Sequence, residues 1–354
     1  MKSFKLYIVL CLIIIFISCK NYKQDDFSVI EYSNSKIMRI HDTLIGKSYN
    51  LHEALKVRRI DEISSFLILV SEKSESNNLI SLYNKSNLNH RYSFAKYGKG
   101  PGELLTPVTI DKSKNKNLFL IQDGTKQKGF IYELDSIINN GGNYIPKEES
   151  IINYPDLFCY DLFYLDDDKF LTTSFHKNKQ FLIIDRMGNV IKTFGHYPDI
   201  KQKENTTKFL YGDIFQGVYD IKPDRSKMVQ ALLTFDEIII YDLINDGNRV
   251  TIKTGENNPF QKEYKNTTQD FSYISTYCSD SMIYALWGGN SIRGNTPTGN
   301  FLQIFDWQGN HIKTLFLNVP LFDFCVNESE GKIYGINFEL NESLTVYNYS
   351  FEFR

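Results

Sequence analysis

Residues 185–193 read Asp-Arg-Met-Gly-Asn-Val-Ile-Lys-Thr, and residues 306–314 read Asp-Trp-Gln-Gly-Asn-His-Ile-Lys-Thr. The two stretches align without a gap and share Asp, Gly, Asn, Ile, Lys and Thr at matching positions. Each follows an apolar run of strand-forming residues. Gly-Asn supplies the positive φ angles of a tight turn, and Ile-Lys-Thr predicts a return strand with alternating faces. The pair indicates a repeated β-hairpin.

The strand that precedes this hairpin recurs along the whole chain. Six apolar runs, most of them ending in an acidic residue or Asn, cover residues 79–84, 129–134, 181–185, 237–242, 301–306 and 344–348. The distance from one strand end to the next is roughly 42 to 64 residues. Polar clusters rich in Asn, Asp, Gly and Ser separate the strands, and no long stretch has a clean helical period.

This repeat predicts an all-β fold, a six-bladed β-propeller with four-stranded blades, because a radial array buries both faces of each sheet. We expect an early strand near residues 37–40 to complete the last blade, which ends in a strand at residues 349–353, and so to close the ring. A pair of β-sandwiches is the alternative, although it does not require six similar units.

The N-terminus has the composition of a lipoprotein signal. Lys2 and Lys5 precede 12 apolar residues from Leu6 to Ile17, a run that spans about 18 Å as a helix and is too short to cross a bilayer. Ser18 and Cys19 follow. We therefore expect a signal peptide at residues 1–18, a lipid-modified Cys19 with a flexible tether over residues 19–35, and the propeller over residues 36–354. An ordinary secretory signal with an incidental cysteine is the alternative.

Composition narrows the classes of partner and of site. The chain has 354 residues, with 23 Tyr and 26 Phe, and a formal net charge of -2, so no basic excess suggests nucleic-acid binding. Beyond Cys19, the mature chain has cysteines only at Cys159, Cys278 and Cys325. Their spacing does not suggest a zinc site, and each lies in or beside an apolar stretch, so we expect buried free thiols. A single disulfide remains the alternative.

The most distinctive run is the glycine-rich segment that contains Gly98, Gly100, Pro101, Gly102 and Glu103. Three glycines permit backbone angles that other residues avoid, and Glu103 can accept hydrogen bonds from the loop's own amides. The run lacks the Gly-Lys-Ser/Thr ending of a phosphate-binding P-loop. We expect a structural loop, with contact to a ligand as the alternative.

This run after the first blade resembles the TolB-like six-bladed propeller lipoproteins common in Bacteroidetes. The resemblance covers most of residues 30–354 and includes the lipobox at Cys19, the hairpin at residues 306–310 and the strand at residues 332–335. It implies a propeller held at the outer membrane, facing the periplasm or displayed on the cell surface. The family has no settled activity, so the resemblance adds almost nothing about chemistry.

A search for catalytic and metal-binding motifs leaves the catalytic, metal and cofactor assignments empty. The histidines have no metal-ligand spacing on one element, and residues 166–169 are typical of a solvated hairpin turn rather than a calcium loop. Trp287, Asn290 and Arg293 lie in a long polar insertion of the fifth blade and are candidate ligand contacts. Arg58 and Arg59 are a second candidate pair, for which a salt-bridged strand end is the alternative.

These features predict a cell-envelope lipoprotein that contacts the membrane through its lipid and binds a protein or a glycan without catalysis. The alternative is a propeller hydrolase or polysaccharide lyase with a metal or a His/Asp/Tyr set at the channel mouth. A third possibility is a purely structural part of an envelope complex.

Overall fold

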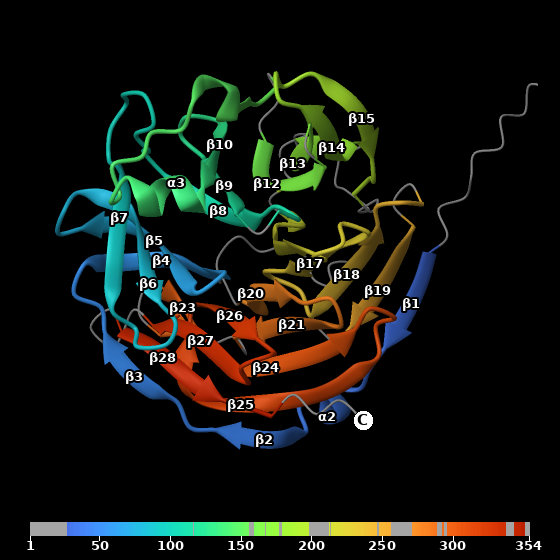
Figure 1. The fold of residues 1–354 in the computed structure, drawn as a ribbon. Helices are drawn as coiled ribbons and strands as arrows, with labels where there is room; N and C mark the ends of the chain where they lie inside the picture. The colour runs from blue at the N-terminus through green and yellow to red at the C-terminus, as the bar shows by residue number, and fades with distance from the viewer. Residues whose placement is uncertain are drawn as a thin grey trace, which may run out of the picture.

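A computed structural model describes the chain over residues 27–115, 117–155, 159–166, 168–176, 179–197, 212, 214–245, 248–255, 271–288, 292–293, 296–337 and 343–350. Within these residues, six antiparallel sheets are arranged around a central axis, as Figure 1 shows. This arrangement is the predicted six-bladed β-propeller, and the sandwich alternative is wrong.

Each blade has four strands that follow one another from the axis to the rim. The first three blades are β4 (Ala54–Ile63), β5 (Phe66–Ser74), β6 (Asn78–Asn84) and β7 (His90–Lys96); β8 (Pro107–Lys112), β9 (Leu118–Asp123), β10 (Lys128–Glu133) and β11 (Ile151–Asn153); and β12 (Cys159–Asp166), β13 (Lys169–His176), β14 (Lys179–Asp185) and β15 (Val190–Phe194).

The last three blades use strands from both ends of the chain. They are β16 (Gly217–Ile221), β17 (Lys227–Leu232), β18 (Glu237–Asp242) and β19 (Arg249–Lys253); β20 (Tyr273–Cys278), β21 (Met282–Trp287), β24 (Gly299–Asp306) and β25 (His311–Leu321); and β26 (Asp323–Asn327), β27 (Lys332–Asn337), β28 (Ser343–Asn348) and β3 (Lys47–Asn50). The short strands β22 (Ile292–Arg293) and β23 (Thr296–Pro297) pair within the insertion between β21 and β24.

The six recurring apolar runs are the third strands of the six blades, namely β6, β10, β14, β18, β24 and β28. They are the clearest signal because a third strand packs on both faces and is almost wholly buried, as β18 is from Glu237 to Tyr241. The outer strands are more exposed and give a weaker pattern, as β15 does, in which all residues from Val190 to Thr193 are exposed.

The two aligned hairpins have the same hydrogen bonds. In each, the Asp carboxylate (Asp185 or Asp306) accepts bonds from the backbone and side-chain amides of the Asn four residues later. The glycine before that Asn has φ = 87° in both turns. The positive φ therefore belongs to the glycine alone, and the Asn caps the turn through its side chain.

An N-terminal segment closes the ring, although by a different strand from the one expected. Residues 37–40 do not enter the last blade: α2 (Asn34–Ile37) ends there and β2 (Ile40–Leu44) pairs in parallel with β25 on the rim of the fifth blade. The strand that completes the last blade is β3, whose Tyr49 pairs with Leu344 of β28. The expected strand at residues 349–353 also differs, because β28 ends at Asn348 and residues 351–353 lie outside the described part.

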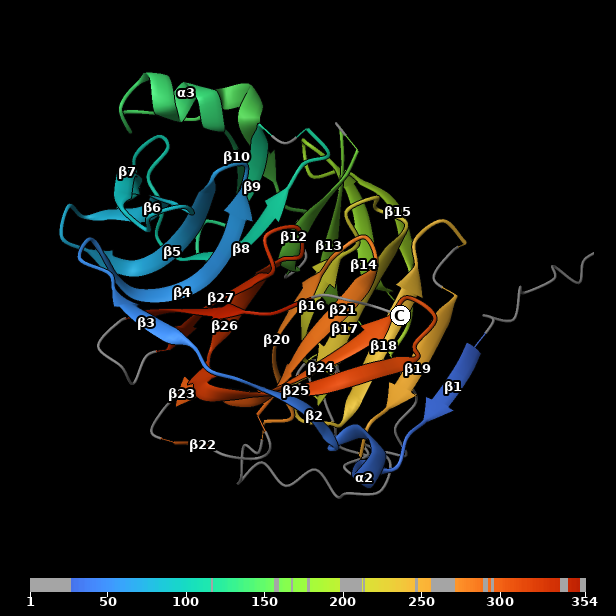
Figure 2. The same ribbon diagram turned by 60° about the horizontal axis from the view of Figure 1, so that its bottom comes forward.

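The tether predicted over residues 19–35 is too long at its C-terminal end. From Phe27 onward the chain is paired, since β1 (Phe27–Glu31) adds a parallel fifth strand to β19 of the fourth blade. Tyr32 then links this segment to the fifth blade, because its Oη donates to Gly309 O and accepts from His311 N. Figure 2 shows β1, α2 and β2 following the outside of the ring.

Helices are few and short in the described residues. Besides α2 they are α3 (Leu134–Asn139) and the 3-10 helix η1 (Glu148–Ser150). Among the described segments, no helix combines the length and the apolar character needed to cross a membrane.

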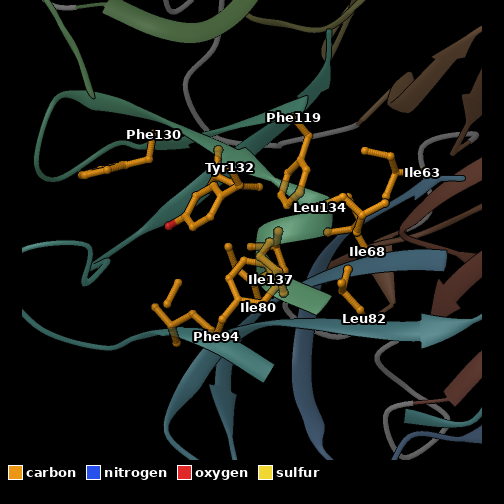
Figure 3. Close-up of a cluster of buried hydrophobic side chains, with 14 of the residues drawn as sticks. Ile63, Ile68, Ile80, Leu82, Phe94, Phe119, Phe130, Tyr132, Leu134 and Ile137 are labelled. Carbon is orange, nitrogen blue, oxygen red and sulfur yellow. The ribbon is translucent and has the colours of Figure 1, made fainter. Parts of the chain in front are cut away.

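A large hydrophobic cluster fills the space between the first two blades, with α3 covering it, as Figure 3 shows. Phe119 and Tyr132 stack at its centre with ring centroids 5.4 Å apart. Both side chains are fully buried, and the Tyr132 hydroxyl has no hydrogen-bond partner within the described structure. The ring of Tyr132 therefore contributes packing, while its hydroxyl carries an uncompensated desolvation cost.

We expect Phe119→Ala to lower the free energy of unfolding by about 3–5 kcal/mol, because it leaves a cavity at the centre of this cluster. Tyr132→Phe keeps the packing and removes only the unpartnered hydroxyl, so it should leave stability unchanged or raise it by about 1 kcal/mol. Urea unfolding of the three proteins measures both effects. A loss of several kcal/mol in Tyr132→Phe would contradict the assigned environment of the hydroxyl.

Candidate functional site

The innermost strands β4, β8, β12, β16, β20 and β26 surround a narrow channel on the propeller axis. All six strands contribute to its lining, which is rich in polar side chains, among them Asp61, Asp161, Asp220, Asp323, Arg59, Tyr219 and Tyr277. Its cavity is only about 80 Å³. Such a volume admits a few water molecules and is too small for a sugar or a cofactor.

Aspartates of the inner strands hold successive blades together. Asp111 Oδ2 accepts the Tyr164 N–H of the third blade at 2.7 Å, and Asp220 Oδ2 accepts the Cys278 N–H of the fifth blade at 2.5 Å. Each inner strand has one edge without a neighbouring strand, so these bonds satisfy backbone groups that the sheet cannot pair.

The same kind of bond closes the ring. Asp323 of the last blade accepts the Ile60 N–H of the first blade at 2.9 Å through Oδ2, and its Oδ1 accepts the Ser275 hydroxyl. Aspartate–amide bonds thus connect blade 2 to 3, blade 4 to 5 and blade 6 to 1. The sequence alone does not reveal this function, because Asp61 and Asp161 lie on the innermost strands of blades 1 and 3 as well and no pattern separates them from the three bonding aspartates.

Charged pairs fill the end of the channel at which the inner strands terminate. Arg225, on the turn after β16, reaches the second blade, where its Nη1 lies 2.9 Å from Asp111 Oδ1. Lys112 Nζ lies 2.6 Å from Asp61 Oδ1 and 5.2 Å from the centre of the Tyr277 ring. The Arg225–Asp111 pair and the Lys112–Tyr277 contact connect blades that are not adjacent, whereas the Lys112–Asp61 pair joins the neighbouring first and second blades.

Burial dominates the electrostatics of the channel. Desolvation raises the pKa of Asp161 and of Asp323, and Arg59 opposes this effect at both carboxyls. Desolvation, together with the charge of Asp61, raises the pKa of Asp220 to about 7. Asp220 is therefore a channel carboxyl that changes its charge near neutral pH.

A second and larger hollow, the mouth pocket, adjoins the channel where β8 and β26 begin. It is lined by Arg58, Arg59, Ser71, Glu72, Leu105, Thr106, Pro107, Val108 and Phe322 and has a volume of about 500 Å³. Arg59 lines both the channel and the mouth pocket. The volume is within the usual range of small-ligand sites, and the mixed lining is typical of them.

The arginine pair predicted from sequence lies in this pocket, and part of the expected salt bridge is present. Arg58 forms an ion pair with Glu72 on β5. Arg59 donates from Nε to Val108 O at 2.9 Å, and its Nη1 lies 3.7 Å from Asp323 Oδ1.

The glycine-rich run is a self-supported loop between β7 and β8. Glu103 Oε2 accepts the Gly100 N–H at 2.6 Å, as the sequence suggested, and Lys126 Nζ donates to Glu103 O at 2.6 Å. A Cβ on Gly98 would lie 2.1 Å from Glu103 Oε2, and Gly102 has φ = 71°. The backbone conformation therefore needs a glycine at Gly102, whereas a side chain at Gly98 would displace the Glu103 carboxylate that supports the loop. The loop leads directly into the Leu105–Val108 wall of the mouth pocket.

The three candidates in the insertion are not brought together by the described structure. Trp287 ends β21, packs edge-on against Phe301 and points its Nε1 toward Asp236 Oδ1 at 3.3 Å. Asn290 lies outside the described residues, and only the backbone of Arg293, in β22, is described.

Cysteines and histidines add no candidate centre. Cys159, Cys278 and Cys325 are free and buried, as expected. Burial, with His41 and Lys36 nearby, lowers the pKa of His311 to about 4. In the described part of the chain, no three His, Cys, Asp or Glu side chains are grouped so as to hold a metal ion.

We expect Asp220→Asn to change the pH dependence of stability. Since the folded pKa of Asp220 is raised to about 7, its ionisation penalises the folded state progressively from about pH 4 to pH 7 and by a constant amount above that. The stability difference, variant minus wild type, should therefore increase by about 2–3 kcal/mol between pH 5 and pH 8. Urea unfolding at both values measures it, and an identical difference at the two pH values would contradict the raised pKa.

Comparison with known proteins agrees with this architecture. A family model described as TolB-like 6-blade propeller-like matches residues 34–329. A Bacteroides fragilis protein named as an exported protein has a similar structure, with a TM-score of 0.51, 12% identity, and coverage of 90% of this chain and 99% of that one. The Myceliophteria thermophila Cps50 (Swd1) β-propeller domain gives a TM-score of 0.49, with 9% identity and coverage of 86% and 100%. No curated protein matches the chain. Because the family model covers most of its length, the chain belongs to the TolB-like 6-blade propeller-like family.

Proposed function

We propose that this protein is a cell-envelope lipoprotein, anchored through a lipid on Cys19, whose propeller binds a glycan at the mouth pocket without catalysis. The observation that carries the binding function is the pocket itself, about 500 Å³ in volume, with two arginines and an apolar wall. A pocket of this size encloses a ligand of one or a few rings. A protein partner needs about 800 Å² of complementary surface, so the pocket favours the glycan among the two ligand classes expected from sequence.

A lipid on Cys19 would hold one side of the propeller near the membrane. Cys19 lies eight positions before Phe27, where β1 begins on the rim of the fourth blade. A chain of this length spans at most about 28 Å. An anchor on Cys19 would therefore keep the rim of the fourth blade close to the membrane, while the mouth pocket lies beside the axis.

Lipidation predicts that Cys19→Ser loses both the attached fatty acid and the membrane association. The lipid chains contribute roughly 0.8 kcal/mol per buried CH2 group to membrane binding, and the variant loses this contribution. Metabolic labelling with a palmitate analogue and fractionation of the producing cells measure the two properties. An unlabelled wild type, or a variant that remains in the membrane fraction, would refute the anchor.

Binding is tested by presenting the detergent-solubilised full chain to a glycan array. Thr106 is exposed at the pocket rim, so Thr106→Trp should fill the pocket and reduce binding by about tenfold or more without disturbing the core. Thr193→Trp is the matched control, because Thr193 is exposed on the outer strand of the third blade.

The proposal expects at least one glycan to bind to the wild type and to the control, and to be recovered with unchanged mass. Equal binding by both variants, or no binding at all, would refute the pocket. A cleaved glycan would show that the protein is an enzyme.

A further inference from the structure

A β-bulge brings both arginines of the mouth pocket to one place. Neighbouring residues of a regular strand point to opposite faces of the sheet. In β4, however, Val57 pairs with Ser71 and Arg59 pairs with Val70, so the strand register shifts by one residue at Arg58. The bulge redirects the strand locally, and as a result both Arg58 and Arg59 line the pocket.

The pocket contains hydrogen-bond donors that the described residues do not use. Arg59 has five N–H groups, and within the described part of the chain only Nε donates a hydrogen bond, to Val108 O. Its Nη1 is 3.7 Å from Asp323, beyond hydrogen-bond distance. Ser71 is only 1% exposed in the pocket wall, and none of the described residues forms a hydrogen bond with its hydroxyl. The pocket wall thus holds a buried hydroxyl and a guanidinium whose hydrogen-bonding groups are not all used. Such groups point to a ligand that accepts hydrogen bonds.

The unused N–H groups of Arg59 favour a ligand with an ionised acceptor, and the neighbouring carboxylates favour a small charge on it. The guanidinium groups of Arg58 and Arg59 already face the carboxylates of Glu72, Asp323 and Asp161. A dianionic phosphate would place its second charge near these carboxylates. A carboxylate brings one charge, and its two oxygens match the planar fork of a guanidinium.

The rest of the lining suits a sugar ring. Leu105, Pro107, Val108 and Phe322 form an apolar wall, against which the C–H face of a pyranose can pack. The Thr106 hydroxyl lies at the exposed rim, 2.7 Å from the Thr125 hydroxyl, and offers polar contacts for ring hydroxyls.

The geometry points to a uronic acid, a pyranose that carries a carboxylate, as the sugar that the mouth pocket recognises, with the carboxylate on Arg59 and the ring against Phe322. This inference rests on the proposed glycan binding and assigns the chemical class of the ligand.

Isothermal titration calorimetry of the detergent-solubilised full chain tests the inference with digalacturonate, diglucuronate and the neutral disaccharides of the same linkages. We expect at least one acidic disaccharide to bind about tenfold or more tightly than its neutral counterpart. Arg59→Lys keeps the positive charge beside Asp323 but loses the planar fork, and should remove that preference. Arg39→Lys, the same change at an exposed position away from the pocket, should leave it intact.

If neutral disaccharides bind as tightly as the acidic ones and Thr106→Trp loses this binding, the uronic-acid assignment is overturned. The proposed glycan function would then still stand. An acidic preference that survives in Arg59→Lys would overturn the assignment to Arg59. A failure of every sugar to bind, on the array as well as in the calorimeter, would overturn both the inference and the proposed function.

Discussion

The whole structure depends on how the innermost strand of each blade satisfies its free edge. A propeller places these six edges around the axis, where no further strand fits, and buried N–H groups there need an acceptor. Three aspartates provide it. Asp111, Asp220 and Asp323 each accept a backbone N–H of the following blade, and the last of these contacts joins blade 6 to blade 1. Ring closure is thus a polar interaction at the axis as well as a strand added at the rim by β3.

The two ends of the channel differ in how their side chains are arranged. At one end, Arg225 pairs with Asp111 across non-adjacent blades and Lys112 pairs with Asp61 of the neighbouring blade, which costs desolvation and leaves little open space. At the other end, the bulge in β4 and the loop supported by Glu103 leave a hollow. Arg59 belongs to both regions, since it faces the channel carboxylate of Asp323 and also lines the pocket. The scaffold and the candidate site therefore share one side chain.

Sequence predicted the fold well because the third strands are buried on both faces and the hairpin at Asp185 recurs at Asp306. It misplaced the closing strand, because the exposed residues of β3 leave no apolar pattern, whereas residues 37–40 look more like a strand. The pair Arg58–Arg59 was recognised as a candidate, but its pocket was not, since Thr106 and Phe322 come from other blades. The aspartate–amide bonds also depend on inter-blade geometry that no single segment encodes.

We propose that this propeller, closed by aspartates at its axis, binds an acidic sugar at the open end of the channel. A crystal structure of the protein with bound digalacturonate is the decisive experiment. We expect the sugar in the mouth pocket, with a carboxylate on the Arg59 guanidinium and a ring against Phe322. A sugar bound at another face, or an empty pocket at saturating ligand, would contradict it.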